Sequence, residues 1–251
     1  MKLYIIPNMQ KESTTDVLSF VQDYTQDNGH TFVVDEEEGK RLPEDGDFDA
    51  VLTLGGDGTF LRGARIAYHF DKPIIGINTG KEGRLNEMNV ENYKELFPLW
   101  LEKKIDIKTL ECPLIHYVLP NKEEGVSINE VACTILTSIS HFHLTDNKDE
   151  TIYATRASGF LLCSPIGSTG YNLSAGGAIL SHTLDAFEIT PICPFSGDKY
   201  SKIIRTDNTY TLVSDKAFYV SVDGEEAITI KENEKIILTK AEKPLLIQKI
   251  K

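Results

Sequence analysis

The stretch VLTLGGDGTFL, residues 51–61, joins a short apolar run to a turn dense in glycine. The run at 51–54 is too short for a buried helix and rich in strand formers, so it predicts a buried parallel strand. Open α/β sheets bind ligands at the carboxyl ends of such strands. Gly55, Gly56 and Gly58 let the backbone approach a phosphate chain, and the N–H groups that open the next helix attract anions. The stretch therefore predicts a nucleotide-binding loop.

Asp57 stands among these glycines and decides the chemistry of the turn. A carboxylate repels phosphate, so in a phosphate loop it needs a role such as accepting a proton or holding a metal. An ordinary tight turn is the alternative, because Asp and Gly are common turn residues. Motifs elsewhere in the sequence are needed to choose between a phosphate-binding loop and an ordinary turn.

The sequence around this turn alternates between short apolar runs and helical patterns. Strands are expected at 3–6, 31–34, 51–54 and 74–77. Helices are expected from about residue 14 to 28, through 61–68, and over 90–102, where Pro98 kinks or divides the helix. This alternation predicts a doubly wound parallel sheet in an N-terminal α/β domain of residues 1–103.

The strand at 74–77 also ends in a polar turn, Asn78-Thr79-Gly80. If this strand neighbours the one at 51–54, both turns lie at the same edge of the sheet and can enclose one phosphate chain. A plain strand-to-helix turn is the alternative for the tripeptide alone.

Residues 104–251 follow a different pattern, in which short alternating strands are separated by turns. These strands are expected at 105–119, 126–138, 140–145, 150–155, 209–213, 217–222, 226–230, 235–239 and 244–250. The predicted fold class is therefore α/β plus all-β, with the N-terminal doubly wound α/β domain followed by a C-terminal antiparallel β-rich domain.

Two features of this second domain are unusual for plain strands. Asn129 and Glu130 are polar neighbours inside a strand-like run, and one of them must face inward if the strand is covered on one side. An edge strand with both side chains exposed is the alternative.

Residues 159–180 place many hydroxyls and glycines after an apolar strand, and such a loop can bind a polyol or phosphates. A flexible surface loop is the alternative there.

The composition limits the classes of partner. Lys and Arg number 26 against 38 Asp and Glu, a net charge of -12 that disfavours a nucleic-acid surface. No run approaches the length of a membrane helix and no signal peptide is recognisable, so we expect a cytoplasmic protein with no membrane partner. The four cysteines form no C-x-x-C pair and are expected to be buried thiols. A zinc site that combines them with His141 and His143 is a weak alternative.

Four motifs together resemble the NAD kinases. They are GGDGTFLR at 55–62, NTG at 78–80, NE at 129–130 and SPIGSTGYNLSAGGAIL at 164–180. The resemblance implies an ATP-dependent kinase that transfers the γ-phosphoryl group of ATP to the 2′-hydroxyl of the adenosine ribose of NAD, giving NADP. It also implies Mg²⁺ brought by ATP, with no metal ligands assigned to side chains, and a homodimer or homotetramer whose sites borrow residues from a neighbouring subunit.

The resemblance assigns roles to individual positions. Asp57 matches the base that accepts the proton of the ribose hydroxyl, the kind of help that phosphoryl transfer to an alcohol needs. The positions implied for ATP and its phosphates are Gly55, Gly56, Gly58, Thr59, Asn78, Thr79 and Gly80. Those implied for NAD are Asp57, Gly58, Arg62, Asn129, Glu130, Arg156, Ser158, Ile166, Thr169, Gly170, Tyr171, Asn172 and Ser174.

The chain departs from the family pattern at several of these positions. Ser158 stands where the family has an Asp, and Arg84 stands where T-G-x-L-G-F ends in an aromatic residue. Gly170 replaces the usual Ala, and Ile166 replaces a Thr or Ser. These departures fall on the nicotinamide end of the site and leave Asp57 unchanged.

Two other functions share part of the pattern. A lipid or sphingoid kinase has the same GGDG loop, but its acyl site needs apolar lining, which the hydroxyl-rich loop does not provide. A non-catalytic NAD(P) sensor would keep the binding loops and lose turnover, although Asp57 would then have no chemical role.

Overall fold

The computed structural model describes residues 1–81 and 83–251, so Glu82, in the segment that departs from T-G-x-L-G-F, lies outside the described residues. The chain forms two compact units. Unit 1 comprises Met1–Glu111 and Leu245–Lys251, and unit 2 comprises Cys112–Pro244. The first unit thus extends to residue 111, whereas the expected boundary was residue 103. The last strand of the chain also belongs to the first unit and not to the β domain.

Unit 1 is built on one sheet with strand order β2-β1-β3-β4-β20-β6, and β5 pairs with the end of β4. The strands are β1 (Lys2–Pro7), β2 (Thr31–Val34), β3 (Ala50–Leu54), β4 (Ile74–Asn78), β5 (Met88–Asn89), β6 (Ile107–Cys112) and β20 (Leu245–Ile250). β1, β2, β3, β4 and β20 pair in parallel. The expected doubly wound α/β unit is confirmed.

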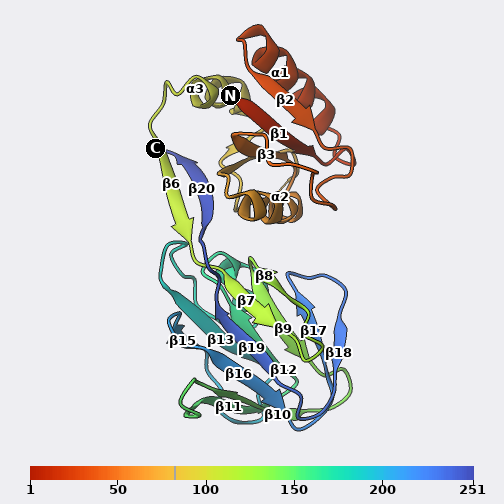
Figure 1. Cartoon of the computed structure of the whole chain (residues 1–251), viewed down its shortest axis with the longest axis vertical. Coiled ribbons are helices and arrows are strands. Elements are labelled where there is room, and N and C mark those ends of the chain that lie inside the picture. The colour runs from red at the N-terminus through yellow and green to blue at the C-terminus, as the bar shows by residue number, and fades with distance from the viewer. Residues whose placement is uncertain (82) are drawn as a thin grey trace. The chain divides into compact units, whose positions relative to one another are not determined.

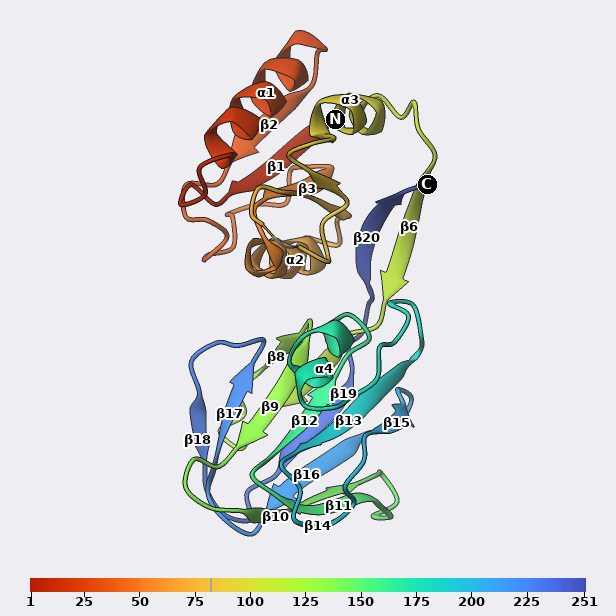
Figure 2. The same ribbon diagram turned by 180° about the vertical axis from the view of Figure 1, so that it is seen from behind.

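Three helices cover the two faces of this sheet (Figures 1 and 2). They are α1 (Thr14–Asp27), α2 (Asp57–Phe70) and α3 (Tyr93–Leu101). Val17, Phe97 and Trp100 from α1 and α3 share a core with the sheet. α2 covers the opposite face so closely that a Cβ on Gly63 would lie 2.4 Å from Thr53 Cγ2. Pro98 lies inside α3 without dividing it.

Unit 2 consists of two antiparallel sheets. One has the order β14-β11-β10-β16-β19-β7-β8 and the other β15-β13-β12-β9-β17-β18. The strands are β7 (Ile115–Val118), β8 (Glu124–Ser127), β9 (Glu130–Thr134), β10 (Ser140–Thr145), β11 (Thr151–Ala157), β12 (Gly159–Cys163), β13 (Ala186–Ile192), β14 (Ser196–Gly197), β15 (Lys202–Arg205), β16 (Tyr210–Ser214), β17 (Phe218–Val222), β18 (Ile228–Ile230) and β19 (Ile236–Lys240). A short turn η1 (Gly167–Thr169) and helix α4 (Tyr171–Ser174) follow β12.

The core of unit 2 lies between its sheets, where Phe142 and Leu212 of one sheet share a cluster with Phe160 and Phe218 of the other. The predicted antiparallel β-rich domain is thus confirmed as a two-layer structure. Three cysteines are buried as expected, whereas Cys193 is exposed, because it follows the last residue of β13 in a turn.

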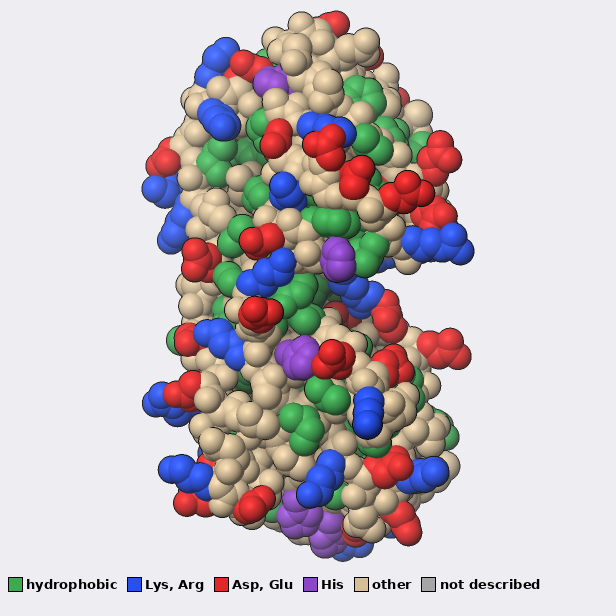
Figure 3. All heavy atoms as spheres, viewed as in Figure 1, with side chains coloured by type: hydrophobic (Ala, Val, Ile, Leu, Met, Phe, Trp, Pro, Cys, Tyr) green, Lys and Arg blue, Asp and Glu red, His purple; other side chains and the backbone are tan. Residues whose placement is uncertain are grey.

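The surface carries mixed charge. On the face drawn in Figure 3, acidic and basic side chains are interspersed over both units. Among the residues that the structure describes, no helix has the length and apolar character needed to cross a membrane.

Candidate active site

The carboxyl ends of β1, β3 and β4 bring three loops of unit 1 together. The three strands are adjacent and parallel, so their ends lie at one edge of the sheet. Backbone bonds join the loops: Asn8 N donates to Leu54 O at 2.8 Å, and Gly55 N donates to Ile77 O at 3.0 Å. The glycine turn and the Asn78-Thr79-Gly80 turn therefore lie beside each other, as the sequence predicted for neighbouring strands.

The glycine turn is shaped by close packing at its start and by open space further on. A Cβ at Gly55 would lie 2.3 Å from Thr59 Oγ1, so a side chain does not fit there. Gly56 is the N-cap of α2 and has no side chain to satisfy the first N–H groups of the helix. Among the described residues, no atom outside the backbone of the helix itself lies within 4 Å of a Cβ placed on Gly58. An anion can therefore approach the N-terminal end of α2.

Asp57 is the first residue of α2, and its carboxylate is held by the loop that follows β4. Arg84 N–H donates to Oδ1 and Oδ2 at 2.9 and 3.1 Å, and Leu85 N–H donates to Oδ1 at 3.1 Å. These bonds fix the direction of the carboxylate. A pocket of about 470 Å³ adjoins the same loop, lined by Asn78, Lys81, Gly83, Arg84, Asn86, Glu87, Met88 and Asn89.

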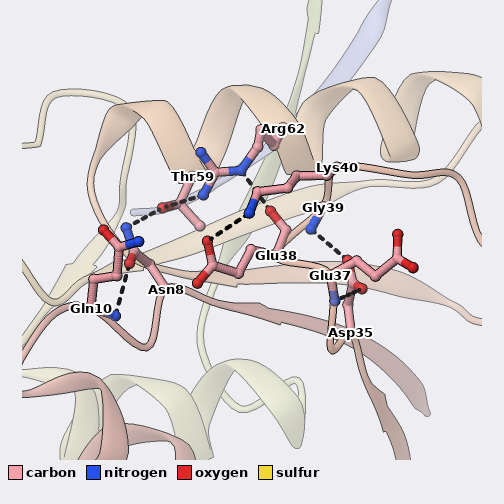
Figure 4. A network of polar contacts seen from close by, with 9 residues as sticks. All are labelled: Asn8, Gln10, Asp35, Glu37, Glu38, Gly39, Lys40, Thr59 and Arg62. Carbon is pink, nitrogen blue, oxygen red and sulfur yellow. Dashed lines mark hydrogen bonds and ion pairs between the residues drawn. The ribbon is translucent and has the colours of Figure 1, made fainter.

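Arg62 bridges the acidic connector and Thr59 of α2 (Figure 4). Its Nε donates to Glu38 O at 2.6 Å, and its Nη2 donates to Thr59 Oγ1 at 3.4 Å. Asn8 Nδ2 donates to the same hydroxyl at 3.4 Å. Arg62 and Asn8 thus support Thr59, and a direct contact of Arg62 with NAD stays a prediction.

The second turn uses its own side chains for its shape. Asn78 Oδ1 accepts the N–H of Gly80 at 3.0 Å, and the hydroxyls of Thr79 and Thr14 lie 2.7 Å apart. Lys11, which was not predicted, also lies beside this turn, with its Cε 4.0 Å from a Cβ built on Gly80. Its position just after β1, a neighbour of β3, is the signal that would have identified it.

In unit 2, Asn129 and Glu130 lie at the start of β9, between β12 and β17. The edge-strand alternative is therefore wrong, and Glu130 is only 7% exposed. Asn129 Oδ1 and Glu130 Oε2 are buried and have no hydrogen-bond partner in the part of the chain that the structure describes. Such buried, unpaired oxygens are expensive, so they indicate positions at which a ligand donates hydrogen bonds.

The loop after β12 packs directly on this pair. Ser164 N donates to Asn129 O at 2.8 Å, and a Cβ on Gly167 would lie 2.3 Å from the same oxygen. A Cβ on Gly170 would lie 3.9 Å from both Asn129 Nδ2 and Glu130 Oε2. The structure thus brings the Asn-Glu pair and the glycine-rich loop together, and the flexible-loop alternative does not describe its buried first half.

The side chains of this loop divide into two groups. Tyr171 is 42% exposed, Gly170 and Ser174 are exposed, and Thr169 is half-buried, so all four are accessible. Asn172 is fully buried, donates to Glu188 Oε2 at 2.9 Å and accepts from Thr190 Oγ1 at 2.6 Å.

Ile166 is also buried, at 1% exposure. Neither side chain is exposed, and a contact of Asn172 or Ile166 with NAD stays a prediction. The amide of Asn172 is used to hold the loop to β13, and Ile166 packs in the interior.

A further residue, Asp223, was not predicted. It follows β17 and accepts hydrogen bonds from the backbone of the Asn-Glu pair, including Asn129 N at 2.7 Å. Burial, and then the charge of Asp223, raise the pKa of Glu130 to about 7. The local signal was an Asp-Gly turn after a strand, which is too common to be distinctive.

Arg156 and Ser158 lie elsewhere in unit 2. Glu130 pairs with Cys163 at one end of β12, whereas Ser158 precedes the other end. Cys163 follows Ser158 by five positions along the chain, which is about 17 Å at about 3.4 Å per residue. The Arg156 guanidinium stacks 5.2 Å from the centre of the exposed Phe195 ring. One copy of unit 2 therefore does not bring these two residues to its own Asn-Glu pair.

Within residues 1–81 and 83–251, no three His, Cys, Asp or Glu side chains converge to hold a metal ion. His141 and His143 stack on β10 with ring centres 6.4 Å apart, and the structure adds no cysteine to them.

Comparison with known proteins gives a consistent result. The family model for the ATP-NAD kinase N-terminal domain matches residues 4–105, and that for the ATP-NAD kinase C-terminal domain matches residues 129–250. A NAD kinase of Lachnoclostridium phytofermentans is 30% identical, with 96% of this chain and 90% of the relative aligned. A NAD kinase of Clostridium beijerinckii is 31% identical over 78% of this chain and 72% of the relative.

Solved structures share the fold. Yeast NADH kinase complexed with NADH has a TM-score of 0.84 at 22% identity, covering 100% of this chain and 83% of that one. A NAD kinase from Archaeoglobus fulgidus in complex with ATP has a TM-score of 0.77 at 23% identity, covering 98% and 93%.

Proposed function

This chain belongs to the NAD kinase family and is an ATP-dependent NAD kinase, and we propose that it transfers the γ-phosphoryl group of ATP to the 2′-hydroxyl of the adenosine ribose of NAD. The observation that carries the choice of acceptor is the pair of buried, unpaired oxygens on Asn129 and Glu130. Ribose hydroxyls are hydrogen-bond donors, and they satisfy such oxygens without introducing charge.

In this proposal Asp57 is the general base. Its carboxylate stands at the N-terminus of α2 and is aimed by the N–H groups of Arg84 and Leu85. It accepts the proton of the attacking hydroxyl as the bond to the γ-phosphorus forms, and ADP leaves with the electron pair of the breaking P–O bond. A general base of this kind contributes roughly 10²–10⁴-fold to the rate.

The glycine turn and the Asn78-Thr79-Gly80 turn are proposed to bind the phosphates of ATP. Gly58 leaves open space at the end of α2, where backbone N–H groups favour anions. Lys11, in the loop that follows β1, adds a cation to this edge.

A divalent cation, Mg²⁺, is proposed to enter with ATP. The described side chains offer no cluster of three metal ligands, and Mg²⁺ commonly binds through substrate phosphates and water with few protein ligands. When bound with the nucleotide, such a cation would neutralise phosphate charge.

Thr169, Tyr171 and Ser174 are proposed to contact the adenosine and diphosphate of NAD, because they are accessible on the loop that packs against the Asn-Glu pair. Arg156 and Ser158 are proposed to contact the nicotinamide end of NAD bound to a second copy, in a homodimer or homotetramer. The exposed Phe195 beside Arg156, and Tyr200 at 86% exposure, support burial of this region in such an assembly.

The test is an assay of NADP formation from NAD with ATP and Mg²⁺, with Asp57→Asn as the control. We expect NADP well above the control. Binding of NAD by calorimetry with no NADP above the control would instead establish the sensor, and phosphorylation of diacylglycerol without NADP would establish the lipid kinase.

A further inference from the structure

The carboxylate of Asp223 gathers donors from one short segment, the connection between β8 and β9. Oδ1 accepts Asn129 N at 2.7 Å, Ile128 N at 3.1 Å and Glu130 N at 3.2 Å, and Oδ2 accepts Ile128 N at 3.0 Å. Ser127 Oγ donates to Oδ1 at 2.8 Å. A single carboxylate therefore fixes three consecutive backbone N–H groups.

A second kind of hydrogen bond joins the same two segments, because the backbone N–H of Asp223 donates to Glu130 O at 3.0 Å. Asp223 has a φ of 51° and Gly224 a φ of 77°, so the turn after β17 adopts a left-handed conformation that few residues favour. This conformation directs the carboxylate back onto β9, and it indicates a turn selected for its geometry.

The segment that Asp223 holds carries the two unpaired oxygens. Asn129 Oδ1 and Glu130 Oε2 are both buried, and both side chains face Gly170 of the loop after β12. We propose that Asp223 is a positioning residue for NAD: it sets the direction of Asn129 and Glu130, and its charge makes the binding of NAD depend on pH near neutrality. This inference rests on the proposed function.

The charges around Glu130 support the second part of the proposal. Asp223 faces it from the turn after β17, and the carboxylate of Glu188 lies on β13, beyond β12. Cys163 faces it from β12, and burial raises the pKa of that thiol far above its ordinary range, so the thiol is neutral. Of the two carboxylates, Asp223 acts on Glu130, whose pKa is raised to about 7 first by burial and then by that charge.

The direction of the effect follows from the chemistry of the acceptor. An ionised Glu130 accepts hydrogen bonds from the ribose hydroxyls, whereas a protonated carboxyl loses part of this capacity. NAD binding therefore favours the ionised form and releases a proton when it occurs below about pH 7. Binding should weaken by about tenfold from pH 8 to pH 6, because roughly a tenth of a group with this pKa is ionised at pH 6.

The experiment measures the Kd for NAD by calorimetry from about pH 5.5 to 8.5 in wild type, Asp223→Asn and Asp146→Asn. Asp146 is a matched control, because its buried carboxylate also accepts backbone N–H groups, those of Lys148 and Glu150 at 2.9 and 3.0 Å, in a hairpin of the other sheet. In wild type and in Asp146→Asn, the change of the Kd for NAD with pH should have the same midpoint, near pH 7.

In Asp223→Asn the midpoint should fall by about one pH unit, because a like charge is removed from Glu130. At pH 8 the Kd should rise, since the amide cannot accept all the N–H groups that the carboxylate accepts. The KM for ATP should not change. A weaker Kd with an unmoved midpoint would mean that Asp223 acts only through structure, and it would overturn the electrostatic part of the proposal.

Glu130→Gln keeps the proposal testable if Asp223→Asn does not fold. Its Kd for NAD should be independent of pH over this range, and a midpoint near pH 7 in that variant would overturn the proposal. Turnover is measured separately: wild type that binds NAD with the expected midpoint but forms no NADP would contradict the proposed function and leave the role of Asp223 standing.

Discussion

Arg84 donates its backbone N–H to both carboxylate oxygens of Asp57, at 2.9 and 3.1 Å. The link uses the main chain, so the replacement of the family's aromatic residue by Arg84 leaves this contact intact. A carboxylate has about four acceptor positions, and those not used by the loop are available for a hydroxyl proton. The loop thus orients the Asp57 carboxylate without using all of its acceptor positions.

Asp57→Asn tests this arrangement. The amide oxygen still accepts from Arg84 and Leu85, so the fold and NAD binding should be retained, while kcat should fall by about 10²–10⁴-fold because the amide accepts no proton. NADP formation and thermal melting measure the two effects. Asp16→Asn, an acidic residue in the first turn of α1, is the matched control and should keep full activity. An active Asp57→Asn would exclude Asp57 as the base.

Gly58→Ala separates binding from folding in the glycine turn. Its Cβ would meet no other described residue within 4 Å, and Ala favours a helix over Gly by about 1 kcal/mol, so the melting temperature should not fall. The methyl group occupies the space proposed for phosphates and should raise the KM for ATP by about tenfold or more. Gly55→Ala should instead destabilise the fold, because its Cβ would lie 2.3 Å from Thr59 Oγ1. An unchanged KM for ATP in Gly58→Ala would place the phosphates elsewhere.

The first unit was largely predictable because independent signals coincided. At residues 51–70 an apolar run, a glycine turn and a helical pattern follow one another, and the structure has β3 and α2 there. The placement of β20 was not predictable. Its sequence, LLIQKI, fits a strand in either unit, and only the tertiary structure decides that it pairs with β4.

The strand β13 was missed because Glu188 and Pro191 interrupt its apolar pattern. The structure explains both exceptions. Asn172 Nδ2 and Ala178 N–H donate to the Glu188 carboxylate, at 2.9 and 2.7 Å. Pro191 lies past the last pairing with β15, which covers only residues 186–189, so its missing N–H breaks no bond on that side.

The site residues also differ in how far the sequence alone identifies them. The accessible residues of the loop after β12 and the Asn-Glu pair belong to distinctive sequence motifs, and the structure brings them together. The family resemblance assigned Asn172 to NAD, and its side chain is buried in the structure; a buried amide and a ligand-binding amide cannot be told apart in sequence. Asp223 is distant along the chain, and only the pairing of β17 with β9 reveals it.

The raised pKa of Glu130 predicts how stability depends on pH. Because the folded pKa of about 7 exceeds the ordinary value of 4.5, the native state binds more protons between these values, and stability falls as the pH rises from about 4.5 to 7. The loss is on the order of 3 kcal/mol. Glu130→Gln removes this loss, so its melting temperature relative to wild type should increase between pH 5 and pH 8. A constant difference between the two proteins would contradict the raised pKa.

Ser158→Asp restores the residue that the family commonly has at this position. The backbone there is already bonded, Ser158 N to Ile192 O at 3.0 Å and Ile135 N to Ser158 O at 2.8 Å, so the substitution should be tolerated. A hydrogen bond to a charged group contributes about 1.5–3 kcal/mol against roughly 1 for a neutral one. The KM for NAD should therefore fall by up to ~30-fold while the KM for ATP stays constant.

The contact made by Ser158 is proposed to lie at the nicotinamide end of NAD held by a second copy, about 17 Å along the strands from the Asn-Glu pair of its own chain. The effect should therefore disappear under conditions that separate the copies, as judged by light scattering at the assay concentration. Ser138→Asp, which adds the same charge at an exposed serine of unit 2, should leave both KM values unchanged. If Arg84 already supplies the compensating contact, the added carboxylate in Ser158→Asp would leave the KM for NAD unchanged or raise it. Either result would mean that this position no longer takes part in binding the dinucleotide.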